Sequence, residues 1–222
     1  MSSRTITLLR TLVPALGVTV AFIVAGCNIV APAYLLIHGP EKIQAVYELD
    51  ANRTTVIFID DPKNRIPRRA LRMVAAQETE RILLEDRALK DVVATQSAMA
   101  VSIQDRYGES FSVVEIGKAV KAEVVLYAVI DEFSLSQDGQ SYSPIVTMRV
   151  RLIDVEKNER IWPLDETTGY LLTAPMRPTR ALIPTAHAEM IEAQTLLAKH
   201  AGRALAQLFY DHERRLSARR GG

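Results

Sequence analysis

The chain has 222 residues, 48% of them hydrophobic and 24% charged, proportions that are typical of a folded globular protein and exclude a disordered one. Its net charge is +1, and residues 1–26 contain two basic and no acidic side chains, so the remainder carries −1 and has no electrostatic reason to bind nucleic acid. The single cysteine excludes an internal disulfide and a cysteine-rich metal site.

Residues 1–26 have the form of a signal peptide. Two arginines precede an uncharged apolar stretch at 11–24, and small residues follow it. Signal peptidases accommodate small residues before the scission point because the chain lies extended in a narrow cleft. The basic end stays in the cytoplasm, so we expect everything after residue 38 to lie outside it.

The tetrapeptide at the end of this segment, Val24-Ala25-Gly26-Cys27, resembles the lipobox of bacterial lipoproteins. The resemblance implies that Val24, Ala25 and Gly26 are recognised by signal peptidase and that Cys27 is the lipid attachment residue. In that group the sulfur receives a diacylglycerol, the bond before it is cut, and the new amine is often acylated, for instance with palmitate. Each buried CH₂ contributes roughly 0.8 kcal/mol, so two or three acyl chains anchor a protein stably where one binds only marginally.

A transmembrane anchor is the alternative interpretation of the same segment. No charged residue occurs from Thr11 to Ile37, and a run of about 20 apolar residues spans a bilayer. Four residues in this run oppose a continuous span, namely Pro14, Gly17, Asn28 and Pro32. The residue directly after Cys27 is Asn28. Sorting rules associate an Asp at this position with retention in the inner membrane, so its absence favours the outer membrane. We expect a lipid-anchored protein of the cell membrane or outer membrane, with its domain facing the periplasm or exterior.

Four segments follow from this interpretation. Residues 1–26 are the signal peptide, and residues 27–50 are a lipid-anchored lead-in whose apolar part either contacts the membrane or packs on the domain. An α/β domain is expected at 51–216. The basic residues at 217–222 are expected to form a disordered tail.

The domain is expected to open with a buried strand at 54–59, because this run is rich in β-branched and aromatic residues. The strand stops at Asp60-Asp61-Pro62. Two adjacent carboxylates suggest acid–base chemistry or a metal, but no histidine or third carboxylate follows at a ligand spacing, so a turn is favoured. Pro67 suits the first turn of a helix, and apolar residues at helical spacing extend that helix to about residue 86.

The middle of the domain is predicted to contain short strands and short helices. A strand is predicted at 91–95, followed by a helix from Ser97 to about residue 106 and another at 111–120. The run at 124–130 is apolar throughout, which predicts a central strand buried on both faces.

The last third begins with the turn signal Asp138-Gly139. A half-exposed strand is predicted at 145–155 because apolar residues alternate there with polar ones, including Arg149 and Arg151. Another strand runs from residue 160 to about 173, and a final helix from 185 to about 216. This order predicts an α/β fold with a mixed sheet of about five strands packed by helices, one of them a long C-terminal helix.

Three stretches resemble a family of envelope proteins comprising CsgG, LpoB and the N-terminal domain of TolB. They are TTVIFIDD, VVEIGKAVKAEVVLYAVIDEF and PIVTMRVRLIDVEKNERIW. The whole chain also resembles bacterial lipoproteins that carry such a domain. The resemblance implies a binding or assembly role at the cell envelope, with protein partners. The chain is too short for the pore strands of CsgG-like proteins and has neither an LpoB-like stalk nor a TolB-like propeller, so no one relative's task is carried over.

Catalysis is not expected. The sequence has no nucleophile elbow, zinc-protease, P-loop or dinucleotide-binding motif, and its four histidines are not spaced as pairs on one helix face. We assign no catalytic, cofactor or metal residue, and expect a non-catalytic binding or assembly module tethered by acyl chains on Cys27 to serve an unidentified envelope protein. The alternative is an oligomeric collar of a secretion or transport machine, assembled through sheet edges or through the face that carries Arg149 and Arg151.

Overall fold

The computed structural model describes residues 42–104 and 111–213. They belong to two compact units. In the first, β1 (Lys42–Ile43) pairs antiparallel with β8 (His212–Glu213). The second unit, Gln44–Asp211, holds the remaining described elements. The predicted signal peptide, most of the predicted lead-in and the predicted basic tail lie outside the described residues.

A six-stranded mixed sheet forms the centre of the Gln44–Asp211 unit, which confirms the α/β fold. The strand order is β3-β2-β4-β5-β6, and β7 also pairs with β5. β2 is parallel to both β3 and β4, whereas β5 is antiparallel to β4, β6 and β7. The strands are β2 (Thr55–Asp60), β3 (Val92–Val93), β4 (Val124–Ser134), β5 (Ile145–Asp154), β6 (Glu159–Trp162) and β7 (Tyr170–Pro175). The apolar run at 124–130 lies in β4, the central strand, as predicted.

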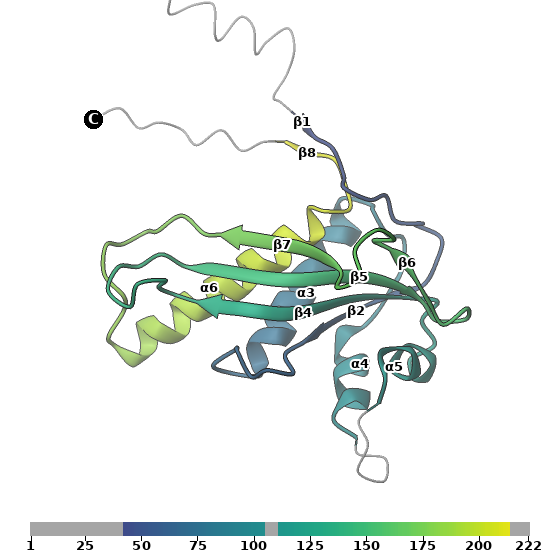
Figure 1. Ribbon diagram of the computed structural model, residues 1–222, viewed down its shortest axis with the longest axis horizontal. Coiled ribbons are helices and arrows are strands. Elements are labelled where there is room, and N and C mark those ends of the chain that lie inside the picture. The colour runs from purple at the N-terminus through teal and green to yellow at the C-terminus, as the bar shows by residue number, and fades with distance from the viewer. Residues whose placement is uncertain (1–41, 105–110, 214–222) are drawn as a thin grey trace, which may run out of the picture. The chain divides into compact units, whose positions relative to one another are not determined.

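Helices cover the two faces of this sheet unequally (Figure 1). The long helices α3 (Ala70–Glu85) and α6 (His187–Ala206) pack on one face and bury the larger core. The short helices α4 (Thr95–Ser102) and α5 (Val113–Ala119) pack on the other face, α4 against β2 and α5 against β4.

The unequal cover follows from the side-chain pattern of β5. Its residues are alternately buried and half-buried, as the sequence predicts for a strand with one polar face. Val150 and Leu152 point into the core beneath α6, and Arg149 and Arg151 alternate with them on the opposite face. Over that opposite face, the described part of the chain places the two short helices.

Two predicted elements differ from the structure in the last third of the chain. The strand predicted from 160 to 173 is two strands, β6 and β7, because Pro163 has no N–H to donate to a sheet ladder. The final helix ends at Ala206 rather than near 216. The carbonyl of Leu208 accepts the backbone N–H groups of Val46 and Tyr47 at 2.8 and 3.1 Å, so the chain beyond the helix is held by the lead-in.

The short helices also begin differently from the prediction. α4 starts at Thr95 and has Ala94 at its N-cap, so Ser97 is not the cap, and the strand before it is only two residues long. The hydroxyl of Thr95 lies within hydrogen-bond distance of the Glu80 carboxylate and the Ile57 carbonyl, which fixes the start of the helix. α5 begins with a capping box between Ser112 and Glu115.

Candidate functional site

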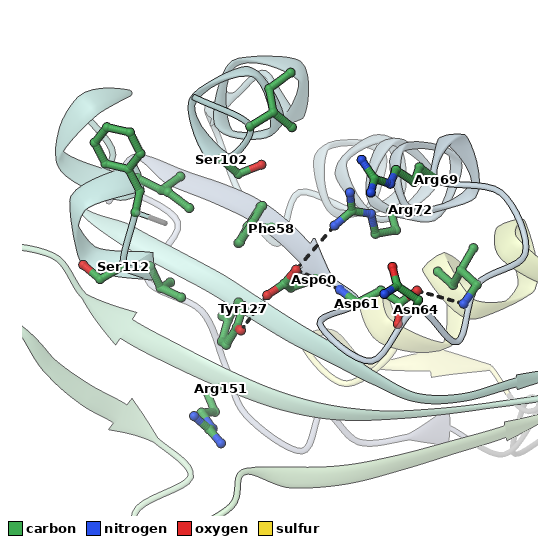
Figure 2. Close-up of a pocket in the computed structure, with 15 residues that line it drawn as sticks. Phe58, Asp60, Asp61, Asn64, Arg69, Arg72, Ser102, Ser112, Tyr127 and Arg151 are labelled. Atoms are coloured by element: carbon green, nitrogen blue, oxygen red, sulfur yellow. Dashed lines mark hydrogen bonds and ion pairs between the residues drawn. The ribbon is translucent and has the colours of Figure 1, made fainter. Parts of the chain in front are cut away.

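A pocket of about 690 Å³ lies where β2 ends and α3 begins (Figure 2). The connection after β2 leads to α3 on one face of the sheet, and the connection before β4 passes through α4 and α5 on the other face. In open α/β sheets, ligands bind in the crevice at the carboxyl ends of strands where such connections diverge. The position of the pocket therefore makes it the candidate site.

Aromatic side chains from neighbouring strands form its floor. Phe58 of β2 and Tyr127 of β4 are directly opposite each other in the parallel ladder. Their rings are stacked with centroids 5.8 Å apart and an interplanar angle of 14°. Phe58 is only 3% exposed, so the half-buried ring of Tyr127 is the accessible part of this floor.

Asp60 is held at the edge of this floor by three donors. One carboxylate oxygen accepts the Tyr127 hydroxyl at 3.1 Å, and the other accepts the backbone N–H of Asp61 at 2.8 Å and Arg72 Nη1 at 3.4 Å. Burial raises the pKa of Tyr127, and the charge and hydrogen bond of Asp60 raise it further, while Arg151 acts in the opposite direction. Tyr127 is therefore a protonated donor at neutral pH.

Asp61 has a structural task. Its two carboxylate oxygens accept the backbone N–H groups of Arg65 at 2.7 Å and Ile66 at 2.8 Å, which closes the turn between β2 and α3. The predicted turn is thus present, but Asp60 beside it lines the pocket. The period-two alternation Val56, Phe58, Asp60 was the signal that places this carboxylate on the same face as the aromatic floor.

Among the described residues, three arginines line the pocket. Arg69 is the N-cap residue of α3, Arg72 lies in its first turn, and Arg151 comes from β5. Arg151 donates from Nε and Nη2 to the carbonyl oxygen of Thr168, at 3.2 and 2.8 Å. Figure 2 shows Arg69 and Arg151 on opposite sides of the Asp60–Tyr127 pair. The Tyr127 ring and the Asp60 carboxylate thus lie between two positively charged side chains.

The residues singled out from the sequence do not meet in this pocket, apart from Asp60, Asp61 and Arg151. Val24, Ala25, Gly26 and Cys27 lie outside the described residues. Arg149 is paired with Asp131, with 2.7 Å between Nε and the carboxylate.

The described histidines belong to other parts of the chain. His187 and His200 are on α6, and His212 is in β8. His200 Nε2 lies 3.2 Å from the Pro175 carbonyl oxygen, and burial lowers the pKa of its imidazole. Within 42–104 and 111–213, no group of three His, Cys, Asp or Glu side chains is placed to hold a metal ion, and no helix has the length and apolar character that a membrane span needs.

Comparison with known proteins gives remote structural likenesses. No known protein family matches the sequence, and no curated protein matches it. Similar solved structures include the PelC dodecamer from Paraburkholderia phytofirmans, with 14% identity and a TM-score of 0.39, covering 77% of this chain and 96% of that one. The lipoprotein GNA1162 from Neisseria meningitidis has 12% identity and a TM-score of 0.39, covering 65% and 94%.

The LpoB C-terminal domain from Salmonella enterica is also similar, with 15% identity and a TM-score of 0.35, covering 59% of this chain and 86% of that one. One of the proteins that the sequence resembles is therefore among the similar solved structures. Likenesses this remote identify neither a family nor a ligand.

Proposed function

We propose that this chain is a lipoprotein of the bacterial cell envelope whose Gln44–Asp211 unit binds a protein partner at the pocket beside β2, without catalysing a reaction. The observation that carries the proposal is the unequal cover of the sheet. Over the face that bears the pocket, the described residues place two short helices, and beside them the half-buried Tyr127 ring and the exposed Ile103 side chain line an open pocket. The sequence around Cys27 supplies the tether.

The hydrogen bonds in the pocket support binding rather than catalysis. Asp60 is occupied by Tyr127, Arg72 and a backbone N–H, and Asp61 by two backbone N–H groups. The raised pKa of Tyr127 keeps its hydroxyl protonated, so it is no general base near neutral pH. These groups hold the shape of the pocket instead of being poised to transfer protons.

The length of the segment between Cys27 and the compact unit limits how far the partner can lie from the membrane. Residues 28–43 separate Cys27 from the compact unit that begins at Gln44. A fully extended chain of this length spans at most about 60 Å. A lipid on Cys27 therefore keeps the pocket close to the membrane surface, and the partner is a membrane-proximal envelope protein.

Site-specific photocrosslinking in cells tests the proposal. A benzoylphenylalanine replaces Ile103, a pocket residue that is 72% exposed, and in the matched control it replaces Leu182, which is also 72% exposed but is not part of the pocket. We expect a discrete crosslinked protein from position 103 alone, lost when Cys27→Ser releases the domain from the membrane. Equal products from both positions, or none from position 103, would contradict the proposal.

A second candidate function is an oligomeric collar, which the free edge of β7 favours. β7 pairs with β5 on one side, and no other described strand pairs with its outer side. Leu171 on this strand is 50% exposed. Unpaired strand edges are templates for pairing with another chain. Light scattering on the detergent-extracted protein tests this function, and a monomer would exclude it.

A further inference from the structure

Backbone groups of β7 point alternately toward β5 and away from it. The Met176 N–H donates to the Pro144 carbonyl oxygen at 2.8 Å, in the register of the β5–β7 ladder. In an antiparallel ladder, every second residue exchanges both of its backbone hydrogen bonds with the neighbouring strand, and the residues between point theirs away. Leu171 and Thr173 therefore direct their N–H and C=O groups to the outer side of β7, which lies at the margin of the sheet (Figure 1).

Other residues close both ends of this outer edge. After the two outward residues, Pro175 has no N–H, and its carbonyl oxygen lies 3.2 Å from His200 Nε2 on α6. Before them, the Gly169 N–H donates to the Glu166 carbonyl oxygen at 3.3 Å. Within the described part of the chain, the backbone groups left for an incoming strand are therefore those of the two residues between.

An incoming strand of the same sequence matches these groups in one antiparallel register. With Leu171 opposite Thr173 of a second copy, symmetry also sets Thr173 opposite Leu171, and each pair exchanges both of its N–H···O bonds. A shift by two residues in either direction sets one outward residue opposite itself and the other opposite Gly169 or Pro175, whose groups are closed. A two-fold axis at Leu172 therefore satisfies all the outward groups.

The charges that flank β7 favour the antiparallel arrangement. Glu166 lies in the loop before the strand, Arg177 follows the strand, and both are exposed. Antiparallel pairing sets the loop of one copy beside Arg177 of the other, so opposite charges meet at both ends, whereas parallel pairing would set like charges side by side. Charged side chains on an edge strand oppose pairing with another chain, and β7 has none.

Exposed apolar side chains lie beside the same edge. Leu171 is directly opposite Arg149, on the face of the sheet that bears the pocket, and is 50% exposed. Leu196 lies one turn before His200 on the same side of α6 and is 46% exposed. Burial of such side chains supplies the free energy that backbone hydrogen bonds, which replace bonds to water, do not supply alone.

We infer that this chain forms a two-fold dimer in which the outer edge of β7 pairs antiparallel with β7 of a second copy, with Leu172 at the axis. The inference goes beyond the proposed function, because the dimer contact lies outside the pocket. Leu171 and Thr173 of the two copies share one face of the joined sheet, so both pockets open on the same side of it. Two-fold pairing uses the same edge in both copies and stops at two, whereas a collar needs two different surfaces to meet.

Oxidative crosslinking in membranes tests the position of the axis. Leu172→Cys sets two thiols at a non-hydrogen-bonded antiparallel pair, where the Cα atoms are about 4.5 Å apart and a disulfide forms. We expect a disulfide-linked species of twice the chain mass. The matched control is Leu182→Cys, at a position that is 72% exposed and lies outside β7, and the unaltered protein controls for Cys27. No disulfide from position 172, an equal yield from position 182, or a disulfide to a different protein would overturn the inference.

Sedimentation equilibrium of the full-length protein in detergent tests the pairing of charges without altering the strand. Glu166→Lys and Arg177→Glu are each expected to weaken the dimer about tenfold, and the double variant is expected to restore it. Glu156→Lys, at an exposed position in the turn after β5, is the matched control and should leave the dimer Kd unchanged. Circular dichroism should be the same for all variants. A monomer at every concentration, a mass above that of a dimer, or a double variant weaker than both single ones would overturn the inference.

Discussion

Asp154, at the end of β5, is a carboxylate that is only 3% exposed. It accepts the backbone N–H of Lys157 at 2.9 Å and Arg53 Nη2 at 2.9 Å. The bond from Lys157 lowers the pKa of Asp154 most, burial opposes this shift, and Arg53 lowers the pKa further. A carboxylate with a lowered pKa stabilises the fold above its unfolded-state pKa, and this contribution is lost as the pH falls through the folded-state pKa.

Asp154→Asn is therefore expected to lower the free energy of unfolding by about 2 kcal/mol at neutral pH, since it leaves Arg53 without its carboxylate. The difference from the unaltered protein should shrink as the pH falls below about 4. Urea unfolding at pH 7 and at pH 3 measures both values. Asp165→Asn, at an exposed position, is the control and should have no effect. A difference that is the same at both pH values would contradict the assigned role.

Tyr127 gives a second prediction at the scale of one residue. Burial and the Asp60 carboxylate raise the pKa of its hydroxyl. The difference between the ultraviolet titrations of the unaltered protein and Tyr127→Phe isolates this group. We expect its midpoint above the ordinary tyrosine value of about 10. A midpoint at or below that value would mean that the Tyr127–Asp60 hydrogen bond does not form in solution.

At the scale of elements, the contact between α3 and α6 depends on Gly202. A Cβ at this position would overlap the carbonyl oxygen of Ala75 on α3. The buried hydroxyl of Thr79 lies 2.9 Å from that oxygen and 3.0 Å from the Gly202 carbonyl oxygen, so it joins the two helices. The helices meet closely because neither presents a bulky side chain there.

Gly202→Ala tests this packing against helix propensity. Alanine is favoured over glycine in a helix by about 1 kcal/mol, so propensity alone predicts a more stable protein. We expect the opposite, a loss of about 2 kcal/mol, because overlap with the Ala75 backbone forces the helices apart. Denaturant unfolding measures the change, with Lys199→Ala on the exposed face of α6 as the near-neutral control. Increased stability in Gly202→Ala would show that the helices separate without cost.

Elements with a strong local pattern could be predicted from the sequence. The buried strand that became β2, the helix α3 and the alternating strand β5 depend on periodicities that lie within the element itself. The end of α6 could not be predicted in this way. The carbonyl of Leu208 binds N–H groups of Val46 and Tyr47, which are far away in the sequence. No local signal reports such a contact.

For the same reason, only part of the candidate site could be predicted from the sequence. Asp60 and Arg151 were recognised as a strand-end residue and a polar-face residue, each correctly placed on its element. Their meeting depends on the strand order β2-β4-β5, which sets Tyr127 between them. Arg69 was part of a polar helix face with nothing to distinguish it from its neighbours. Convergence of residues from three strands and the N-cap of α3 is a property of the topology rather than of any sequence window.

At the scale of the whole molecule, the predicted tether explains why a small binding unit is useful. A lipid confines the protein to a membrane surface, which raises the local concentration of the pocket near any partner held at the same surface. Modest affinity for a partner is then sufficient.

The tether itself is tested by intact mass and detergent partitioning of the membrane-expressed protein. We expect loss of residues 1–26, added acyl mass, and partitioning into detergent, all abolished in Cys27→Ser. Asn28→Asp is the matched control, since it keeps the cysteine and should keep the acyl mass. An unprocessed mass with unchanged retention in Cys27→Ser would instead mean a transmembrane anchor. Because the basic N-terminal end predicts the same orientation for either anchor, that result would contradict the lipid attachment but not the predicted position of the domain outside the cytoplasm.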